Sequence, residues 1–136
     1  EMAIPLILHI CGKTLDRMEY IAQTGMAAFH YDSKNNPAES MGIVEGRISL
    51  VGNVNNPQTL YSKGPEQVRE EVLENLDAHV QLVGPECAIP LQTSIENLKE
   101  IPIAVQAWHK EHTADVETKG PDEEPAQRSA TWTPGG

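Results

Sequence analysis

Residues 4–12 read Ile-Pro-Leu-Ile-Leu-His-Ile-Cys-Gly, and this stretch decides the fold. A short apolar run that ends at a glycine is typical of a strand buried on both faces of a parallel sheet. Three further apolar runs follow along the chain, at 27–32, 48–54 and 80–83, and the last continues toward Cys87. Because each run is followed by a segment with helical spacing of its apolar residues, the chain is predicted to be an α/β protein with a parallel sheet.

The first two helices have start and stop signals in the sequence. Thr14 is expected to cap the helix that follows the first strand, and Gly25 is expected to end it. Asn36, Pro37 and Glu39 predict the start of the second helix, because they supply an N-cap, a proline at the first helical position and an acidic residue at the third.

The remaining helix boundaries follow the same rules. Gly46 is expected to end the second helix, and Gly64-Pro65 is expected to open the third. Residues 93–96, Thr-Ser-Ile-Glu, read as a capping box for a fourth helix. Pro102 is expected to kink that helix or to delay its start.

This pattern of four βα units over residues 1–112 predicts one half of a TIM (βα)8 barrel, since such barrels use roughly 31 residues per unit. No Gly-x-Gly-x-x-Gly follows the first strand, so a doubly wound dinucleotide-binding sheet is not favoured. A half barrel leaves two unpaired edges and an apolar concave face. The chain, which enters a strand almost at once, is therefore expected to need a missing half barrel or another copy of itself.

The last part of the chain has a different character. Residues 113–136 are acidic and rich in Pro and Gly, with no apolar period. This composition predicts a disordered tail. Trp132 is a candidate docking residue there, although a solvated tail without a partner is the favoured interpretation.

Composition argues against several classes of protein. The chain has 20 Asp and Glu against 10 Lys and Arg, a formal net charge of −10, which opposes binding to the phosphates of nucleic acid. No apolar run approaches the roughly 20 residues of a membrane span. Two cysteines are too few for a disulfide framework, and no secretory leader precedes them. A reducing, cytoplasmic setting is therefore expected.

Candidate metal ligands lie at the predicted strand ends. His9 and Cys11 are two residues apart on one strand, so both side chains leave the same face. Cys87 and Asp32 lie at the C-terminal ends of the fourth and second strands, and in a βα-barrel all these ends form the active-site rim. One imidazole and two thiolates suit zinc. The alternatives are two inert buried cysteines beside a core histidine, or a Cys11–Cys87 disulfide.

The candidate ligand set also favours one kind of chemistry. Zinc with three protein ligands keeps an open fourth position, as in catalytic sites. One neutral imidazole and two thiolates leave a net charge near zero, which gives a mild Lewis acid that still deprotonates a bound thiol. Alkyl transfer to sulfur is therefore favoured over hydrolysis, for which harder ligand sets are commoner.

Four segments together form a distinctive combination. They are His9-Ile10-Cys11-Gly12, Leu-Val-Gly-Asn-Val-Asn at 50–55, Gly-Pro-Glu-Gln-Val at 64–68, and Pro-Glu-Cys-Ala-Ile-Pro at 85–90 followed by Glu-Asn-Leu at 96–98. The combination resembles the C-terminal half of the methylcobalamin:coenzyme M methyltransferases, which are uroporphyrinogen decarboxylase-like proteins. The resemblance extends over about residues 4–108.

The resemblance implies a uroporphyrinogen decarboxylase-like TIM barrel in which His9, Cys11 and Cys87 hold zinc. It implies that zinc activates the thiol of coenzyme M, which takes a methyl group from a corrinoid (cobalamin) carried by a small partner protein, as in methanogenesis. It also places Asp32 where a catalytic carboxylate completes the zinc shell until the substrate thiol displaces it. A strand-end carboxylate that caps the next turn is the alternative for Asp32.

Three other residues carry predictions of their own. Glu86, next to Cys87, stands where the family pattern has a small residue. It is expected either to add negative charge near zinc or to point to solvent. His79 stands at an expected glycine and is expected to tolerate left-handed backbone. His30 shares a face with Asp32, where a hydrogen-bonded core histidine is favoured over one that orients the carboxylate.

Three other functions are compatible with the sequence. The first is a uroporphyrinogen decarboxylase-like enzyme acting on a tetrapyrrole, which needs no zinc and therefore does not explain His9, Cys11 and Cys87. The second is a non-catalytic truncated half barrel. The third is a zinc enzyme that alkylates another thiol, such as homocysteine.

Overall fold

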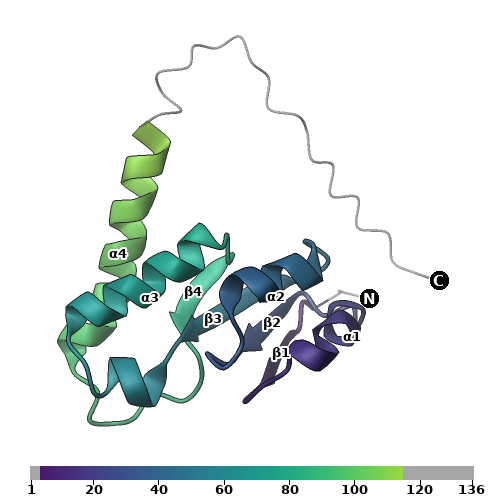
Figure 1. Cartoon of the computed structure of the whole chain (residues 1–136), viewed down its shortest axis with the longest axis horizontal. Helices are drawn as coiled ribbons and strands as arrows, with labels where there is room; N and C mark the ends of the chain where they lie inside the picture. The colour runs from purple at the N-terminus through teal and green to yellow at the C-terminus, as the bar shows by residue number, and fades with distance from the viewer. Residues whose placement is uncertain (1–3, 115–136) are drawn as a thin grey trace.

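The computed structural model describes residues 4–114, in which one parallel sheet is formed by consecutive strands (Figure 1). The strands are β1 (Ile7–Ile10), β2 (Ala28–Tyr31), β3 (Ser49–Val54) and β4 (Leu82–Pro85), and they lie in the order β1-β2-β3-β4. A doubly wound sheet reverses its strand order at a switch point, whereas a barrel wall does not. The α/β fold and the barrel-wall order are therefore confirmed.

A helical segment follows every strand. They are η1 (Leu15–Arg17) with α1 (Met18–Ala22), α2 (Pro37–Val44), the π-helical turn η2 (Asn56–Leu60) with α3 (Pro65–Asp77), and α4 (Ile95–Ala114). The turn η2 was not predicted, and it begins after Asn55, whose side chain accepts a hydrogen bond from Gln58 N at 2.7 Å. Among residues 4–114, none of these helices has the length and apolar character that a membrane crossing requires.

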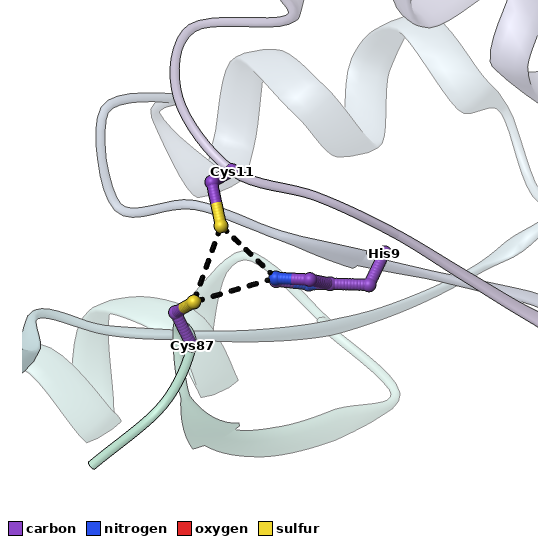
Figure 2. Close-up of side chains that lie close together, drawn as sticks. All are labelled: His9, Cys11 and Cys87. Carbon is purple, nitrogen blue, oxygen red and sulfur yellow. Dashed lines mark hydrogen bonds between the residues drawn. The ribbon is translucent and has the colours of Figure 1, made fainter.

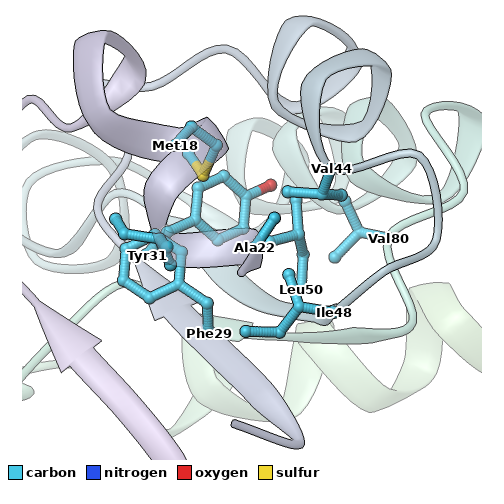
Figure 3. Packing of buried hydrophobic residues seen from close by; sticks show 9 residues of the cluster. Met18, Ala22, Phe29, Tyr31, Val44, Ile48, Leu50 and Val80 are labelled. Carbon is cyan, nitrogen blue, oxygen red and sulfur yellow. The ribbon is translucent and has the colours of Figure 1, made fainter. Parts of the chain in front are cut away.

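The helices cover a single face of the sheet. Residues in register on neighbouring parallel strands share a face, and Phe29 pairs with Leu50. Both are fully buried against Met18 and Val44 from α1 and α2 (Figure 3). Val54, on the same face of β3, lies in the second apolar cluster with residues of α3 and α4.

The opposite face of the sheet is open. It carries Ile7 and His9 on β1, His30 on β2 and Leu82 on β4, as the strand register requires. Ile7 is 62% exposed and Leu82 is 56% exposed. A half barrel has this asymmetry, because its concave face is covered only when the other strands close the barrel.

Of the first three predicted helix starts, two were right and one was wrong. Asn36 caps α2 by accepting from Glu39 N at 3.0 Å, and α3 begins directly after Gly64 as predicted. Thr14 makes no side-chain cap bond to η1. Its hydroxyl and its amide both donate to the Asn35 side chain instead, so a contact from another loop takes the place of the local cap.

The fourth strand begins two residues later than predicted. His79 has the left-handed backbone expected for it, with φ 64°, and Val80 N donates to Asn75 O to close the end of α3. The Gln81 side chain then accepts from Leu50 N at 2.8 Å, in place of a backbone ladder bond. Pairing with β3 therefore starts at Leu82.

The last helix also departs from its prediction. Ser94, not Thr93, accepts the hydrogen bond from Glu96 N, at 3.1 Å, and the helix starts at Ile95. Pro102 lies inside α4 and does not delay its start. The predicted tail lies outside the described residues except for 113 and 114, which are helical, and Trp132 lies outside them as well.

Candidate metal centre

The three predicted metal ligands meet at the carboxyl end of the sheet. His9 is the third residue of β1, Cys11 directly follows that strand, and Cys87 lies two residues beyond β4. Because the strands are parallel, these ends lie at the same edge of the sheet. Topology therefore brings together side chains that are up to 78 residues apart in the sequence.

The ligand atoms form a compact triangle (Figure 2). His9 Nε2 lies 3.2 Å from Cys11 Sγ and 3.4 Å from Cys87 Sγ, and the two sulfur atoms are 3.2 Å apart. Tetrahedral zinc bound to sulfur and nitrogen would place these atoms about 3.5–3.8 Å apart. The triangle is slightly tighter than one face of such a tetrahedron, so small side-chain rotations would admit the ion.

His9 presents the correct nitrogen to the two sulfur atoms. Its Nδ1 donates to His30 O at 3.1 Å. A carbonyl oxygen only accepts, so in the neutral ring the proton resides on Nδ1 and the lone pair on Nε2 is free for a metal. A backbone carbonyl behind the imidazole is a common outer-shell arrangement at metal sites.

His30 supports His9. Among the described residues, its side chain forms no hydrogen bond with the Asp32 side chain. Its Nε2 donates to Pro85 O at 2.8 Å, and its ring lies 4.5 Å from the His9 ring, centroid to centroid. The hydrogen bond predicted for His30 is therefore confirmed, but the ring is half-buried on the open face of the sheet and does not lie in the core. Its contact with Pro85 also links β2 to β4, two residues before Cys87.

The electrostatic surroundings favour a protonated Cys11 when no metal is bound. The hydrogen bond with Cys87 contributes most to raising the pKa of the Cys11 thiol, and desolvation and the nearby carboxylates of Asp32 and Glu86 add to it. A metal ion must therefore displace a proton to bind here, which couples binding to pH. Both cysteines are free thiols.

Asp32 lies at the end of β2 with both oxygens hydrogen-bonded to backbone. Oδ2 accepts from Gly12 N at 2.7 Å, and Oδ1 accepts from Lys34 N at 2.9 Å. Burial opposes ionisation of this carboxyl, yet the two amides outweigh it and lower the pKa of Asp32. The contact with Lys34 is the turn-capping bond of the alternative interpretation, and the role of Asp32 at zinc stays a prediction.

Glu86 does not point to solvent, so that part of its prediction is wrong. The side chain is buried, and its oxygens accept from Ser33 N at 2.8 Å and from Asn56 N at 2.9 Å. Glu86 N donates to Val54 O. The residue before Cys87 is thus bound to two neighbouring loops at once.

Sequence reasoning did not single out Asn35, which is completely buried beside the Cys11 loop. Its Oδ1 accepts from Thr14 N and Leu15 N, and its Nδ2 donates to Gly12 O at 3.0 Å. The available signal was an Asn three residues after the strand-end Asp32, a spacing typical of side chains that hydrogen-bond loop backbone.

Comparison with known proteins identifies the family of this chain. The domain family described as uroporphyrinogen decarboxylase (URO-D) matches residues 1–108. The chain belongs to the uroporphyrinogen decarboxylase family. The resemblance inferred from the four sequence segments is thereby confirmed.

Relatives within the uroporphyrinogen decarboxylase family include methyltransferases of methanogens. The methylcobamide:CoM methyltransferase MtaA of Methanosarcina barkeri is 29% identical over 104 residues, covering 76% of this chain and 31% of the relative. The methylcobamide:CoM methyltransferase MtbA of Methanosarcina mazei is 31% identical over 101 residues, covering 74% of this chain and 30% of the relative.

A solved structure agrees with these sequence matches. It is a methyltransferase from Methanosarcina mazei, 26% identical, with a TM-score of 0.75, covering 77% of this chain and 32% of that one. The chain thus spans under a third of the length of these relatives, and the matched part has the fold of a partial TIM barrel.

Proposed function

We propose that His9, Cys11 and Cys87 hold a zinc ion. The supporting observation is the triangle of one imidazole nitrogen and two sulfur atoms, all within 4.8 Å of one another at the carboxyl end of the sheet. Zinc held by this set would take a substrate thiol at its fourth position and lower the pKa of that thiol enough to give a thiolate.

We further infer that the chain contributes this centre to a methyltransferase. The proposed reaction moves a methyl group from a methylated corrinoid on a small partner protein to the thiol of coenzyme M. The names of the relatives support this donor and acceptor, because MtaA and MtbA are both methylcobamide:CoM methyltransferases. A partner half barrel or a second copy of the chain would supply the rest of the rim.

The protein side chains have distinct parts in this proposal. His9 offers Nε2 because its Nδ1 proton is held by His30 O. Cys11 and Cys87 supply negative charge, which keeps the net charge of the centre near zero and preserves the nucleophilicity of a bound thiolate. Asp32 is proposed to complete the centre before substrate enters, since it lies at the same rim through its bond to Gly12 N.

Metal content tests the zinc site directly. Purified wild-type chain is expected to contain about one zinc per chain by elemental analysis, because three ligands and one open position define a single site. His9→Ala and Cys87→Ala are expected to lose it. His109→Ala, which removes an exposed histidine on α4, is the matched control and should retain it.

The outcomes separate the candidate functions. Zinc lost only in the ligand variants would justify assays of methylcorrinoid with coenzyme M and with homocysteine as thiols. Folded wild-type protein without zinc would exclude the proposed centre, and a tetrapyrrole decarboxylase relative or a non-catalytic half barrel would then be preferred.

A further inference from the structure

The residue after Cys11 is bound to the loop that follows β2. Gly12 O accepts from Asn35 Nδ2 at 3.0 Å, and Gly12 N donates to Asp32 Oδ2. Asn35 also accepts from Thr14 N at 2.7 Å, so its amide spans the turn that leaves the metal centre. Asn35 is fully buried and its bond with Thr14 N is shielded from water, whereas the two bonds of Gly12 are partly buried.

The residue before Cys87 is bound to the same loop. Glu86 Oε2 accepts from Ser33 N at 2.8 Å, while its Oε1 accepts from Asn56 N. Asn56 in turn donates from its side chain to Ala88 O at 2.8 Å, directly after Cys87. The backbone is therefore held on both sides of this cysteine.

The loop itself is anchored to β3. Asn53 Nδ2 donates to Asp32 O and to Asn35 O, at 3.2 and 2.8 Å. Asn55 Nδ2 donates to Ser33 Oγ at 2.8 Å. Residues 32–35 thus connect the two strand ends that carry the cysteines through hydrogen bonds, although β1 and β4 are not neighbours in the sheet.

We propose that Asn35 and Glu86 are positioning residues that set the separation of Cys11 and Cys87 through the 32–35 loop. The inference rests on the zinc centre proposed above and deepens it. Neither residue contacts the metal position. Asn35 acts through Gly12, and Glu86 acts through the backbone that it shares with Cys87. Two thiolates held at a fixed spacing lose little freedom when a metal binds, which favours tight tetrahedral binding.

The test compares Glu86→Gln and Glu86→Ala with a matched variant, Glu100→Gln. Glu100 on α4 is also buried, and its carboxylate pairs with the Arg69 side chain at 2.6 Å, but it takes no part in the hydrogen bonds that hold the cysteine loops. Zinc affinity is measured by competition with a chromophoric chelator, and the cobalt-substituted protein reports thiolate ligation by its charge-transfer absorption. Chemical unfolding of each metal-free variant measures stability separately.

Glu86→Gln is expected to weaken zinc binding about 10- to 100-fold, the usual effect of losing an outer-shell partner. Glu100→Gln should leave the zinc affinity unchanged. Glu86→Ala should weaken zinc further and shift the cobalt spectrum toward that of Cys87→Ala. If Glu86→Ala does not fold, Glu86→Gln still decides, because its side chain has the same shape and keeps one acceptor.

The failures can be told apart. Wild-type affinity and an unchanged cobalt spectrum in Glu86→Gln would overturn the positioning role while leaving the zinc centre intact. An equal loss of zinc affinity in Glu100→Gln would also overturn it, since general destabilisation would then explain the result. Wild-type protein that binds neither zinc nor cobalt would overturn the zinc centre itself and the positioning role with it.

Discussion

At the scale of single residues, Gly52 occupies a backbone position that a side chain would disturb. Its φ is +135°, and a Cβ atom there would lie 2.8 Å from Tyr31 O on the neighbouring strand. Tyr31 cannot easily move, because it is fully buried and its hydroxyl donates to Asn75 Oδ1 at 3.2 Å. Burial also raises the pKa of the Tyr31 phenol, which keeps it a neutral donor.

Gly52→Ala is therefore expected to destabilise the fold by more than about 1 kcal/mol, because both the backbone conformation and the contact resist a Cβ. Gly84→Ala on β4 is the control, since a Cβ there meets nothing within 4 Å. Urea unfolding followed by circular dichroism measures both. Equal stability of the two variants would contradict the close approach of Gly52 to Tyr31 O.

At the scale of elements, α2 depends on its N-cap. Asn36 accepts from Glu39 N, and Pro37 occupies the first helical position. Asn36→Ala is expected to cost about 1 kcal/mol of unfolding free energy, because one amide at the helix start loses its acceptor. Asn36→Asp keeps an acceptor and should retain most of the stability in the same urea titration. An unchanged unfolding free energy in Asn36→Ala would show that the cap is not needed.

The link between α1 and the end of α2 gives a pH-dependent stability. Arg47 donates two hydrogen bonds to the Glu19 carboxylate. Chiefly through these bonds, with help from Gln23, the pKa of Glu19 falls from 4.5 to about 2. A carboxyl with a depressed folded-state pKa stabilises the fold above its unfolded pKa. That contribution is lost as pH falls from 4.5 through about 2.

Glu19→Gln should therefore be less stable than wild type near neutral pH, and the difference should shrink at about pH 3. The effect is expected to be small and to decrease in high salt, because the side chains of Arg47 and Glu19 are 36% and 50% exposed. Urea unfolding at both pH values measures it. A difference that grows on acidification would have the wrong sign for this pair.

At the scale of the whole molecule, the open sheet face needs a covering surface. Ile7 and Leu82 are more than half exposed on this face, which also carries His9. Large exposed apolar patches mark interaction surfaces in soluble proteins. A partner half barrel or a second copy of the chain would bury them.

Without another partner, the chain is expected to self-associate as its concentration rises, and Leu82→Lys should shift it toward monomer. Ile103→Lys, which changes an exposed apolar residue of α4 that is 49% exposed, is the control and should have no effect. Sedimentation velocity over a concentration series measures this. A chain that stays monomeric throughout would contradict association through the open face.

The sequence alone predicted features that depend on short-range spacing. Apolar runs and caps predicted the α/β fold, and the cap at Asn36 and the left-handed His79 followed from local backbone preferences. His9 and Cys11 were predicted to share a face because side chains alternate along a strand. Cys87 was predicted to join them because parallel strands end at one edge, a rule of the fold that needs no coordinates.

Only the tertiary structure decided how polar groups from different loops pair. Thr14 was predicted to cap its own helix, but it donates its hydrogen bonds to the buried side chain of Asn35, which lies 21 residues further along the chain. The sequence did not show whether Glu86 adds charge near zinc or points to solvent. In the structure its side chain is buried, because backbone amides of two other loops donate to it. Spacing along the chain is local information, whereas a hydrogen bond between distant loops depends on where the packed sheet places each donor.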